Sequence, residues 1–130
     1  MDKIWKKLYD AANKVVADKK INDHIDVGGV ASAILTSLNN IYVGVCVEAS
    51  ASLGVCSERN AIFNMLTNGE YEIKKVLTVA CDGKTLLPCG ACRELMVQLS
   101  PSNYKDIEIM SDYEKGEILT LGELIPKWWM

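Results

Sequence analysis

Three cysteines and one glutamate form the pattern with the most evident capacity for chemistry. The motif CSE places Glu58 two residues after Cys56, and the motif PCGAC separates Cys89 from Cys92 by two residues. Each motif begins a segment with helical periodicity, and the dipole and free N–H groups of a helix N-terminus favour thiolate over thiol. Three thiolates at one point are best explained by a divalent metal, and three cysteines with one open position suit zinc and a water molecule.

We therefore predict that Cys56, Cys89 and Cys92 hold one Zn²⁺ ion per subunit. Glu58 is then the candidate catalytic residue, because a fourth protein ligand would close the position that the water needs. Two alternatives use the same residues. Cys89 and Cys92 are also spaced like a redox pair, and Glu58 also suits a plain carboxylate in the first turn of a helix. The third cysteine in a matching context favours the metal.

The other cysteines and the arginines have different predicted roles. Cys46 and Cys81 lie in apolar runs typical of strands, which predicts buried core thiols for both. The only two arginines, Arg59 and Arg93, directly follow Glu58 and a metal-ligand cysteine. There a guanidinium can donate to thiolate sulfurs and offset their excess negative charge, although two ordinary surface arginines would show the same spacing. The sole histidine, His24, lies in a polar stretch and is expected at the surface.

The composition predicts one domain that spans residues 1–130. Hydrophobic residues make up 49% and charged residues 24% of the chain, the balance of a globular protein with its own core. The net charge of −3 argues against a nucleic-acid partner, so a small-molecule ligand is expected. Neither a signal peptide nor a membrane span is evident, and five cysteines fit poorly with a disulfide framework, so we expect a cytoplasmic protein without a membrane partner.

Hydrophobic periodicity and turn residues predict alternating helices and strands. The apolar runs on either side of the turn at Asn39–Asn40 predict a β-hairpin. The strand–helix–strand segments that follow predict an α/β protein with a mixed sheet and helices packed on its faces. The expected helices are 2–18, 58–69, 90–100 and 120–126, and the expected strands are 30–37, 41–48, 75–81 and 106–111.

The two cysteine motifs together resemble the signature of the zinc-dependent cytidine deaminase superfamily, in its form with three cysteine ligands. The stretches CSERNAI and PCGACREL are similar to the zinc-site blocks of cytidine deaminases. The stretch GVASAILTSLNNIYVGVCVE resembles the strands that lead into that site, in cytidine deaminases and in blasticidin-S deaminases. The resemblance covers residues 28–126 and implies a cytidine-deaminase-like, three-layer α-β-α fold with a mixed central sheet.

The resemblance implies a zinc-dependent hydrolase that converts a free cytosine nucleoside, cytidine or deoxycytidine, to its uracil form and releases ammonia. Zinc would make its water ligand acidic, and Glu58 would move the proton of this water to the ring and then to the leaving amine. By the same resemblance, the backbone of Ser57 contacts the pyrimidine edge and the carbonyl of Leu87 lies near the amino group. This activity corresponds to a step of pyrimidine salvage.

The sequence departs from cytidine deaminases where these enzymes hold the ribose. Their strand before the zinc motif carries Asn-x-Glu, whereas this chain has Cys46-Val47-Glu48. A thiol replaces an amide poorly in binding sugar hydroxyls. The loop after Glu48 is short, and the aromatic residue expected near 25–27 is missing. Cys46 and Glu48 are therefore candidate substrate contacts, with a surface carboxylate as the alternative for Glu48, and antibiotic detoxification by a blasticidin-S deaminase is the alternative function.

Two tryptophans close the chain, in the segment IPKWWM. Related deaminases form homotetramers whose C-terminal segments help to close an active site, so the resemblance implies that Trp128 reaches a substrate pocket. Packing of Trp128 and Trp129 on the core of their own chain is an equal alternative. A non-catalytic module stapled by zinc is a less favoured function. A polynucleotide editor is disfavoured by the acidic balance of the chain.

Overall fold

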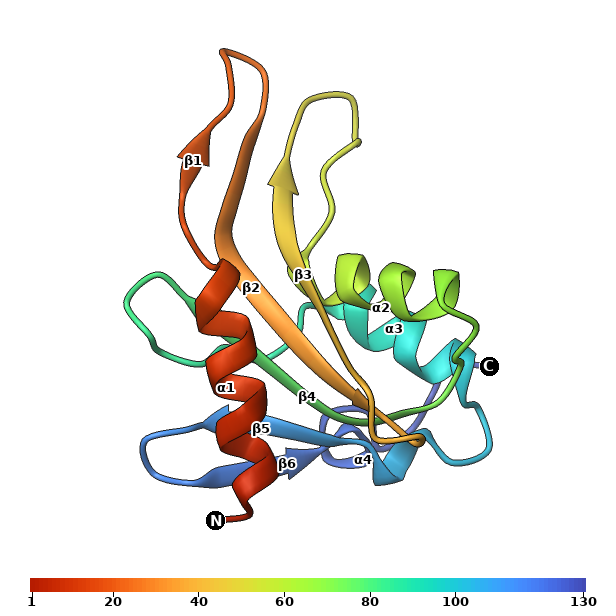
Figure 1. Cartoon of the computed structure of the whole chain (residues 1–130). Helices are drawn as coiled ribbons and strands as arrows, with labels where there is room; N and C mark the ends of the chain where they lie inside the picture. Colours follow the sequence, from red (N-terminus) through yellow and green to blue (C-terminus); the bar gives the residue numbers. More distant parts are fainter.

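The computed structural model describes all 130 residues and contains the predicted alternation of helices and strands (Figure 1). The four predicted strands and the four predicted helices are confirmed, with boundaries that move by a few residues. The helices are α1 (Lys3–Val15), α2 (Ser57–Thr67), α3 (Gly90–Leu99), α4 (Leu121–Leu124) and the short 3₁₀ helix η1 (Tyr104–Asp106). The strands are β1 (Lys19–Lys20), β2 (Asp26–Thr36), β3 (Ile41–Glu48), β4 (Ile73–Ala80), β5 (Glu108–Asp112) and β6 (Glu117–Thr120).

The strands form one mixed sheet, as predicted. β2 lies in its interior, with β3 antiparallel on one side and β4 antiparallel on the other. β4 and β5 are parallel and are joined through α3, β6 pairs antiparallel with β5, and β1 pairs with the beginning of β2. The β2–β3 hairpin has the expected turn, in which Asn39 adopts a positive φ of 66°.

Helices cover both faces of this sheet and give it the predicted three layers (Figure 1). α1 packs on β2 and β4 from one face, whereas α2 packs on β2 and β3 from the other and lies next to α3. Because side chains alternate along a strand, each central strand supplies both cores. The core under α1 contains Trp5, Leu8, Ala12, Ala31, Ala33, Leu77 and Val79. The core under α2 and α3 contains Ile34, Ala61, Ile62, Met65, Val76, Met96 and Ile109.

Three features differ from the sequence prediction. β2 begins at Asp26 and not at residue 30, because the glycine-bearing lead-in continues the strand with a register shift between Val27 and Ala31. β1 and β6 were not expected, since two and four residues are too short to show a strand period. Cys81 was predicted in a strand core, but β4 ends at Ala80 and leaves Cys81 exposed in the turn that follows. That prediction was wrong.

No helix in this fold combines the length and the apolar character that crossing a membrane requires.

Candidate active site

Two helix N-termini bring the three predicted ligands together. Cys56 is the N-cap residue of α2, and Cys89 is the N-cap residue of α3. Neither thiol caps its own helix, so the first-turn N–H groups stay directed at the space in front of both helices. Cys92 lies in the first turn of α3, one helical turn after Cys89. The α2–α3 pairing therefore determines where the sulfurs meet.

The three sulfur atoms form one cluster. All three Sγ atoms lie within 4.8 Å of one another, and Cys89 Sγ lies 3.4 Å from the sulfurs of both Cys56 and Cys92. Cys92 is buried and Cys89 is exposed, so the cluster lies at the boundary between the core and solvent. Glu58 comes from the first turn of α2, and its Oε1 lies 3.9 Å from the sulfur of Cys92. Glu58 is thus beside the cluster.

The thiols have different electrostatic surroundings. Burial raises the pKa of the Cys92 thiol, and the neighbouring Glu58 carboxylate raises it further. Burial also opposes ionisation of Cys89, but hydrogen bonds from the Cys92 amide and from the Cys56 thiol outweigh it and lower the pKa of Cys89. Arg59 contributes a guanidinium nitrogen 3.7 Å from Cys56 Sγ, and the Cys56 thiol raises the pKa of Arg59 most. The buried Nε of Arg59 has no partner.

This donor set fits a zinc ion. Three cysteine sulfurs are soft ligands that zinc prefers, and they leave one position of a tetrahedral ion for a water molecule. A metal would also remove the cost of holding Cys92 as a buried thiolate, because a coordinating thiol is deprotonated outright. The guanidinium of Arg59 is placed to offset the negative charge of three thiolates around one divalent ion.

Glu58, Cys56 and Cys89 line one pocket. Its lining includes two predicted substrate contacts, Ser57 and Leu87. The buried Ser57 hydroxyl donates to Glu58 Oε1 at 3.2 Å, whereas Leu87 lies in the loop before α3 and is partly exposed. The full lining is Val30, Cys46, Cys56, Ser57, Glu58, Thr78, Leu86, Leu87 and Cys89. Most of the lining residues are hydrophobic or cysteines, and the polar ones are Ser57, Glu58 and Thr78.

Cys46 lies at the wall of this pocket. Its side chain is half-buried, not fully buried as predicted for a core thiol, and its sulfur accepts a hydrogen bond from Val30 N at 3.3 Å. Cys46 also lines an adjoining hollow, which continues from the pocket toward Glu48. Glu48 is exposed at the end of the edge strand β3 and does not line the pocket that holds Glu58. Glu48 therefore belongs to the outer part of this surface.

Within one chain, Arg93 lies away from the sulfurs, and Trp128 packs as in the alternative given for it, on the core of its own chain. Arg93 Nε donates to the Pro88 carbonyl at 2.8 Å and makes no hydrogen bond to a sulfur, so it holds the loop that carries Cys89. Trp128 and Trp129 both donate their indole N–H groups to Glu94 of α3. Trp128 packs against the core under α2 and α3 and does not line the Glu58 pocket of its own chain.

Sequence reasoning missed two polar residues, Thr78 in the wall of the pocket and Ser32 behind it. Ser32 of β2 and Thr78 of β4 are buried and directly opposed in the sheet, and Ser32 bonds to the hydroxyls of both Ser57 and Thr78. A signal existed, because each residue interrupts an apolar strand run with one hydroxyl. The register that brings these two strands together could not be read from the local pattern.

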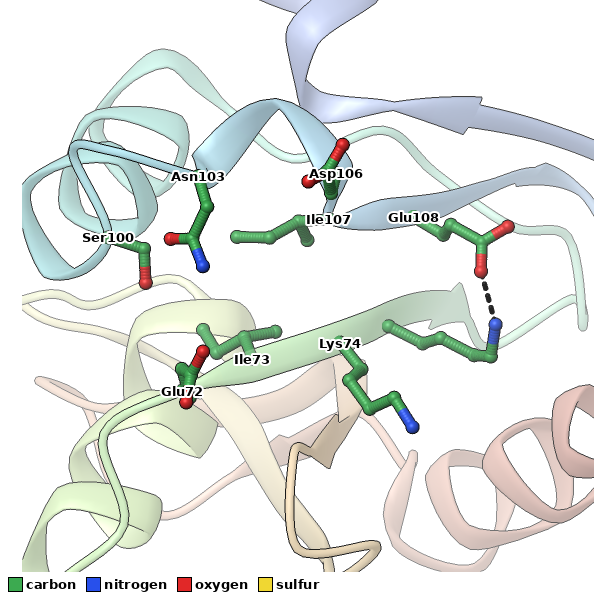
Figure 2. A pocket seen from close by; sticks show the side chains of 9 residues that line it. Glu72, Ile73, Lys74, Ser100, Asn103, Asp106, Ile107 and Glu108 are labelled. Atoms are coloured by element: carbon green, nitrogen blue, oxygen red, sulfur yellow. Dashed lines mark hydrogen bonds and ion pairs between the residues drawn. The ribbon is translucent and has the colours of Figure 1, made fainter.

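A second hollow lies away from the cysteines, where β4 and β5 begin (Figure 2). Lys75 and Glu108 are partners across the parallel strands and form an ion pair, which is the dashed line at the labelled Glu108 in Figure 2. Asn103 and Asp106 border this hollow on the side of η1. It shares no residue with the Glu58 pocket, so it is not part of the candidate site.

Comparisons with known proteins identify the family. The family model described as "Cytidine and deoxycytidylate deaminase zinc-binding region" matches residues 3–105. A cytidine deaminase of Halalkalibacterium halodurans is 32% identical over 100 residues, which cover 75% of this chain and 74% of the relative. A blasticidin-S deaminase of Bacillus cereus is 30% identical over 106 residues, with the same two coverages.

A solved structure of cytidine deaminase from Mycobacterium leprae has a similar fold. It superimposes with a TM-score of 0.76 at 25% identity, over 95% of this chain and 98% of that one. The fold, the family model and the sequence relatives agree with the cluster of three cysteines. The chain belongs to the zinc-dependent cytidine deaminase family and is a zinc-dependent hydrolytic deaminase.

Proposed function

We propose that this chain hydrolyses the exocyclic amine of a free cytosine nucleoside, cytidine or deoxycytidine, to give the uracil nucleoside and ammonia. The observation that carries this proposal is the position of Glu58, a buried carboxylate in the wall of the pocket and 3.9 Å from a ligand sulfur. A structural metal site has no use for such a group, whereas hydrolysis needs a proton carrier next to the attacking water.

Cys56, Cys89 and Cys92 are the residues that would hold the ion. Zinc, when bound, supplies a water of lowered pKa as the nucleophile at neutral pH. Glu58 accepts the proton that the attacking water loses and delivers it to the ring nitrogen N3. Glu58 then transfers the proton of the new C4 hydroxyl group to the amine, which leaves as ammonia while a carbonyl forms at C4.

Groups at the pocket wall orient the base. The backbone of Ser57 contacts the pyrimidine edge, and the Leu87 carbonyl accepts a hydrogen bond from the amine. Val30 and Leu86 offer apolar surface to the faces of the ring. Arg59 offsets charge at Cys56, and Arg93 stabilises the loop of Cys89 through the Pro88 carbonyl. None of these groups takes part in the proton transfers.

The sugar side of the substrate is the main departure from the family pattern. Cys46 lines both the pocket and the hollow that leads toward Glu48, so a substituent on the ring passes over its sulfur. We propose that Glu48 contacts the outer end of that substituent. A thiol that already accepts the Val30 amide is a weak partner for a ribose hydroxyl, and this observation favours blasticidin S as a second candidate substrate.

We further propose a homotetramer in which Trp128 of one subunit approaches the pocket of a neighbour, with the reaction serving pyrimidine salvage in the cytoplasm. All five cysteines are free, which suits a reducing compartment. The large exposed area of Trp129 and Met130 next to Trp128 suits a tail that a second subunit covers. Deletion of residues 127–130 should weaken both assembly and nucleoside affinity. Unchanged sedimentation and kinetics would contradict this assignment.

The direct test is ultraviolet-monitored deamination by zinc-loaded protein with cytidine, deoxycytidine and blasticidin S as substrates. Turnover of the nucleosides, lost in Glu58→Gln, is the expected result. Turnover of blasticidin S alone would contradict the nucleoside proposal and indicate antibiotic detoxification as the function. Stoichiometric zinc without turnover of any of the three compounds would leave a non-catalytic module stapled by zinc and contradict the proposal.

A further inference from the structure

Three buried hydroxyl groups lead from the sheet to the candidate catalytic carboxylate. Thr78 of β4 lies 2.6 Å from Ser32 of β2, measured between the hydroxyl oxygens. Ser32 lies 2.7 Å from Ser57 at the start of α2, and Ser57 lies 3.2 Å from Glu58 Oε1. Each of these side chains is at most 4% exposed. We call Thr78, Ser32 and Ser57 the hydroxyl chain.

Proton counting fixes the direction of the hydroxyl chain. A carboxylate only accepts hydrogen bonds, so Ser57 donates its single hydroxyl proton to Glu58. Ser57 must then accept from Ser32, and Ser32, with its proton used, must accept from Thr78. Every donor therefore points toward Glu58, and each bond polarises the next one in a buried setting.

With a metal bound to the cysteines, Ser57 would be the principal holder of Glu58. Both hydrogen bonds that Glu58 receives end on Oε1, one from the Ser57 hydroxyl and one from the Cys92 thiol. As a thiolate ligand, Cys92 has no proton to donate. Ser57 is then the remaining side-chain donor to the carboxylate. Oε2 has no protein partner and stays available for the proton of the reaction.

Packing alone does not require these hydroxyls. Ser32 lies between Ala31 and Ala33 in β2, and Thr78 lies between Leu77 and Val79 in β4. A buried hydroxyl costs free energy unless it is bonded, so an apolar residue would serve a simple core at least as well. The register places Ser32 directly opposite Thr78 on the face that α2 covers. Since packing does not account for these hydroxyls, the hydrogen bonds of the hydroxyl chain need another explanation.

We propose that the hydroxyl chain positions Glu58: Ser57 holds Oε1, Ser32 holds Ser57, and Thr78 orients Ser32. The carboxylate is thereby restricted to the rotamer in which Oε2 serves the substrate. This inference rests on the deaminase function proposed above. Ser32 is the informative member, because it does not line the pocket and can influence turnover only through its neighbours.

The test compares kcat, KM, zinc content and melting temperature of Ser57→Ala, Ser32→Ala and Thr78→Val. We expect kcat to fall by roughly tenfold in Ser57→Ala and by less in each more distant variant, the size that loss of one hydrogen bond allows. KM for the nucleoside and the zinc content should stay constant. Thr78→Ser, which restores a hydroxyl, should recover most of the kcat that Thr78→Val loses.

Thr36→Val is the matched control. Thr36 is a fully buried hydroxyl on the same strand as Ser32, but it accepts from Asn40 N at 3.2 Å, far from the cysteines along β2. This variant should lower the melting temperature and leave kcat unchanged. Wild-type kcat in both Ser57→Ala and Ser32→Ala, or an equal loss in Thr36→Val, would overturn the positioning role alone. A wild-type protein that is inert on every cytosine compound would overturn the deaminase function together with it.

Discussion

Two buried glutamates lie at opposite ends of α2 and are held in different ways. Glu58 is in the first turn, 4% exposed, and its partners are one hydroxyl and the thiol of Cys92. Glu70 follows the C-terminus of the helix, is 8% exposed, and accepts at one oxygen from Asn40 Nδ2 and from the Tyr42 hydroxyl. Both carboxylates are buried, but only Glu58 borders a pocket and a cluster of sulfurs.

The partners explain the two roles. The nearby Thr36 hydroxyl and the hydrogen bonds from Tyr42 and Asn40 lower the pKa of Glu70, and all three groups belong to the β2–β3 hairpin. Glu70 therefore ties the hairpin to the end of α2 and is a structural group. Burial by itself thus does not mark a catalytic carboxylate. Glu70 also has one buried oxygen without a hydrogen-bond partner, so what distinguishes Glu58 is the pocket and the metal-binding cluster beside it.

The largest expected effect is the loss of turnover in Glu58→Gln. The amide keeps the size of the side chain but cannot carry a proton, so kcat should fall by roughly 10²- to 10⁴-fold. Zinc content and melting temperature should stay near those of the wild type, because the three sulfur ligands are intact. Steady-state deamination with metal analysis of the same sample provides the measurement.

Glu70→Gln is the control for that experiment, since it makes the same chemical change at the other end of α2. It should retain wild-type kcat on the nucleoside. Equal losses of activity in the two variants would remove the distinction between a chemical and a structural carboxylate.

Removal of zinc should affect the two ends of α2 differently. A chelator should abolish deamination, and added Zn²⁺ should restore it. Hydrogen exchange should speed up at the first turns of α2 and α3, where Cys56, Cys89 and Cys92 lose their common ion. The amides around Glu70 should keep their protection. Uniform loss of protection along α2 would mean that the metal supports the whole layer and not only its cysteine end.

Sequence patterns predicted the metal-binding cysteines well, and the remaining parts of the fold and of the site less well. The cysteine motifs are local signals, because each motif opens a helix whose periodicity is also local. Cys81 was misplaced because the apolar run VLTVAC continues one residue past the end of β4. The Ser32–Thr78 contact depends on strand register, which links residues 46 positions apart and has no local signature.

A smaller effect on activity is expected from a substitution at Gly44, where α2 packs on β3. A Cβ atom at Gly44 of β3 would lie 2.3 Å from Ala61 N, a contact that only movement of the helix backbone can relieve. Gly44→Ala should therefore reduce the free energy of unfolding by about 1–3 kcal/mol and lower kcat as well, because Glu58 moves with the helix.

Gly29→Ala is the matched variant for this experiment. Gly29 lies on the neighbouring strand β2, where a Cβ atom would be at an ordinary 3.6 Å from the Asp18 side chain. Denaturant unfolding of both variants measures the difference. A tolerated Gly44→Ala would show that α2 is free to shift without consequence for either carboxylate.

The smallest effect concerns the dependence of stability on pH at Glu70. Its folded pKa lies below the unfolded value of about 4.3, so its hydrogen bonds stabilise the fold above that pH and lose this contribution as the pH falls through the folded pKa. Glu70→Gln should lower the melting temperature by roughly 5 °C at pH 7, and the gap from the wild type should narrow below about pH 4. Thermal melts of both proteins at pH 7 and pH 3.5 measure this gap. A gap that stays constant with pH would mean that hydrogen bonds to neutral Glu70, and not its charge, hold the hairpin on α2.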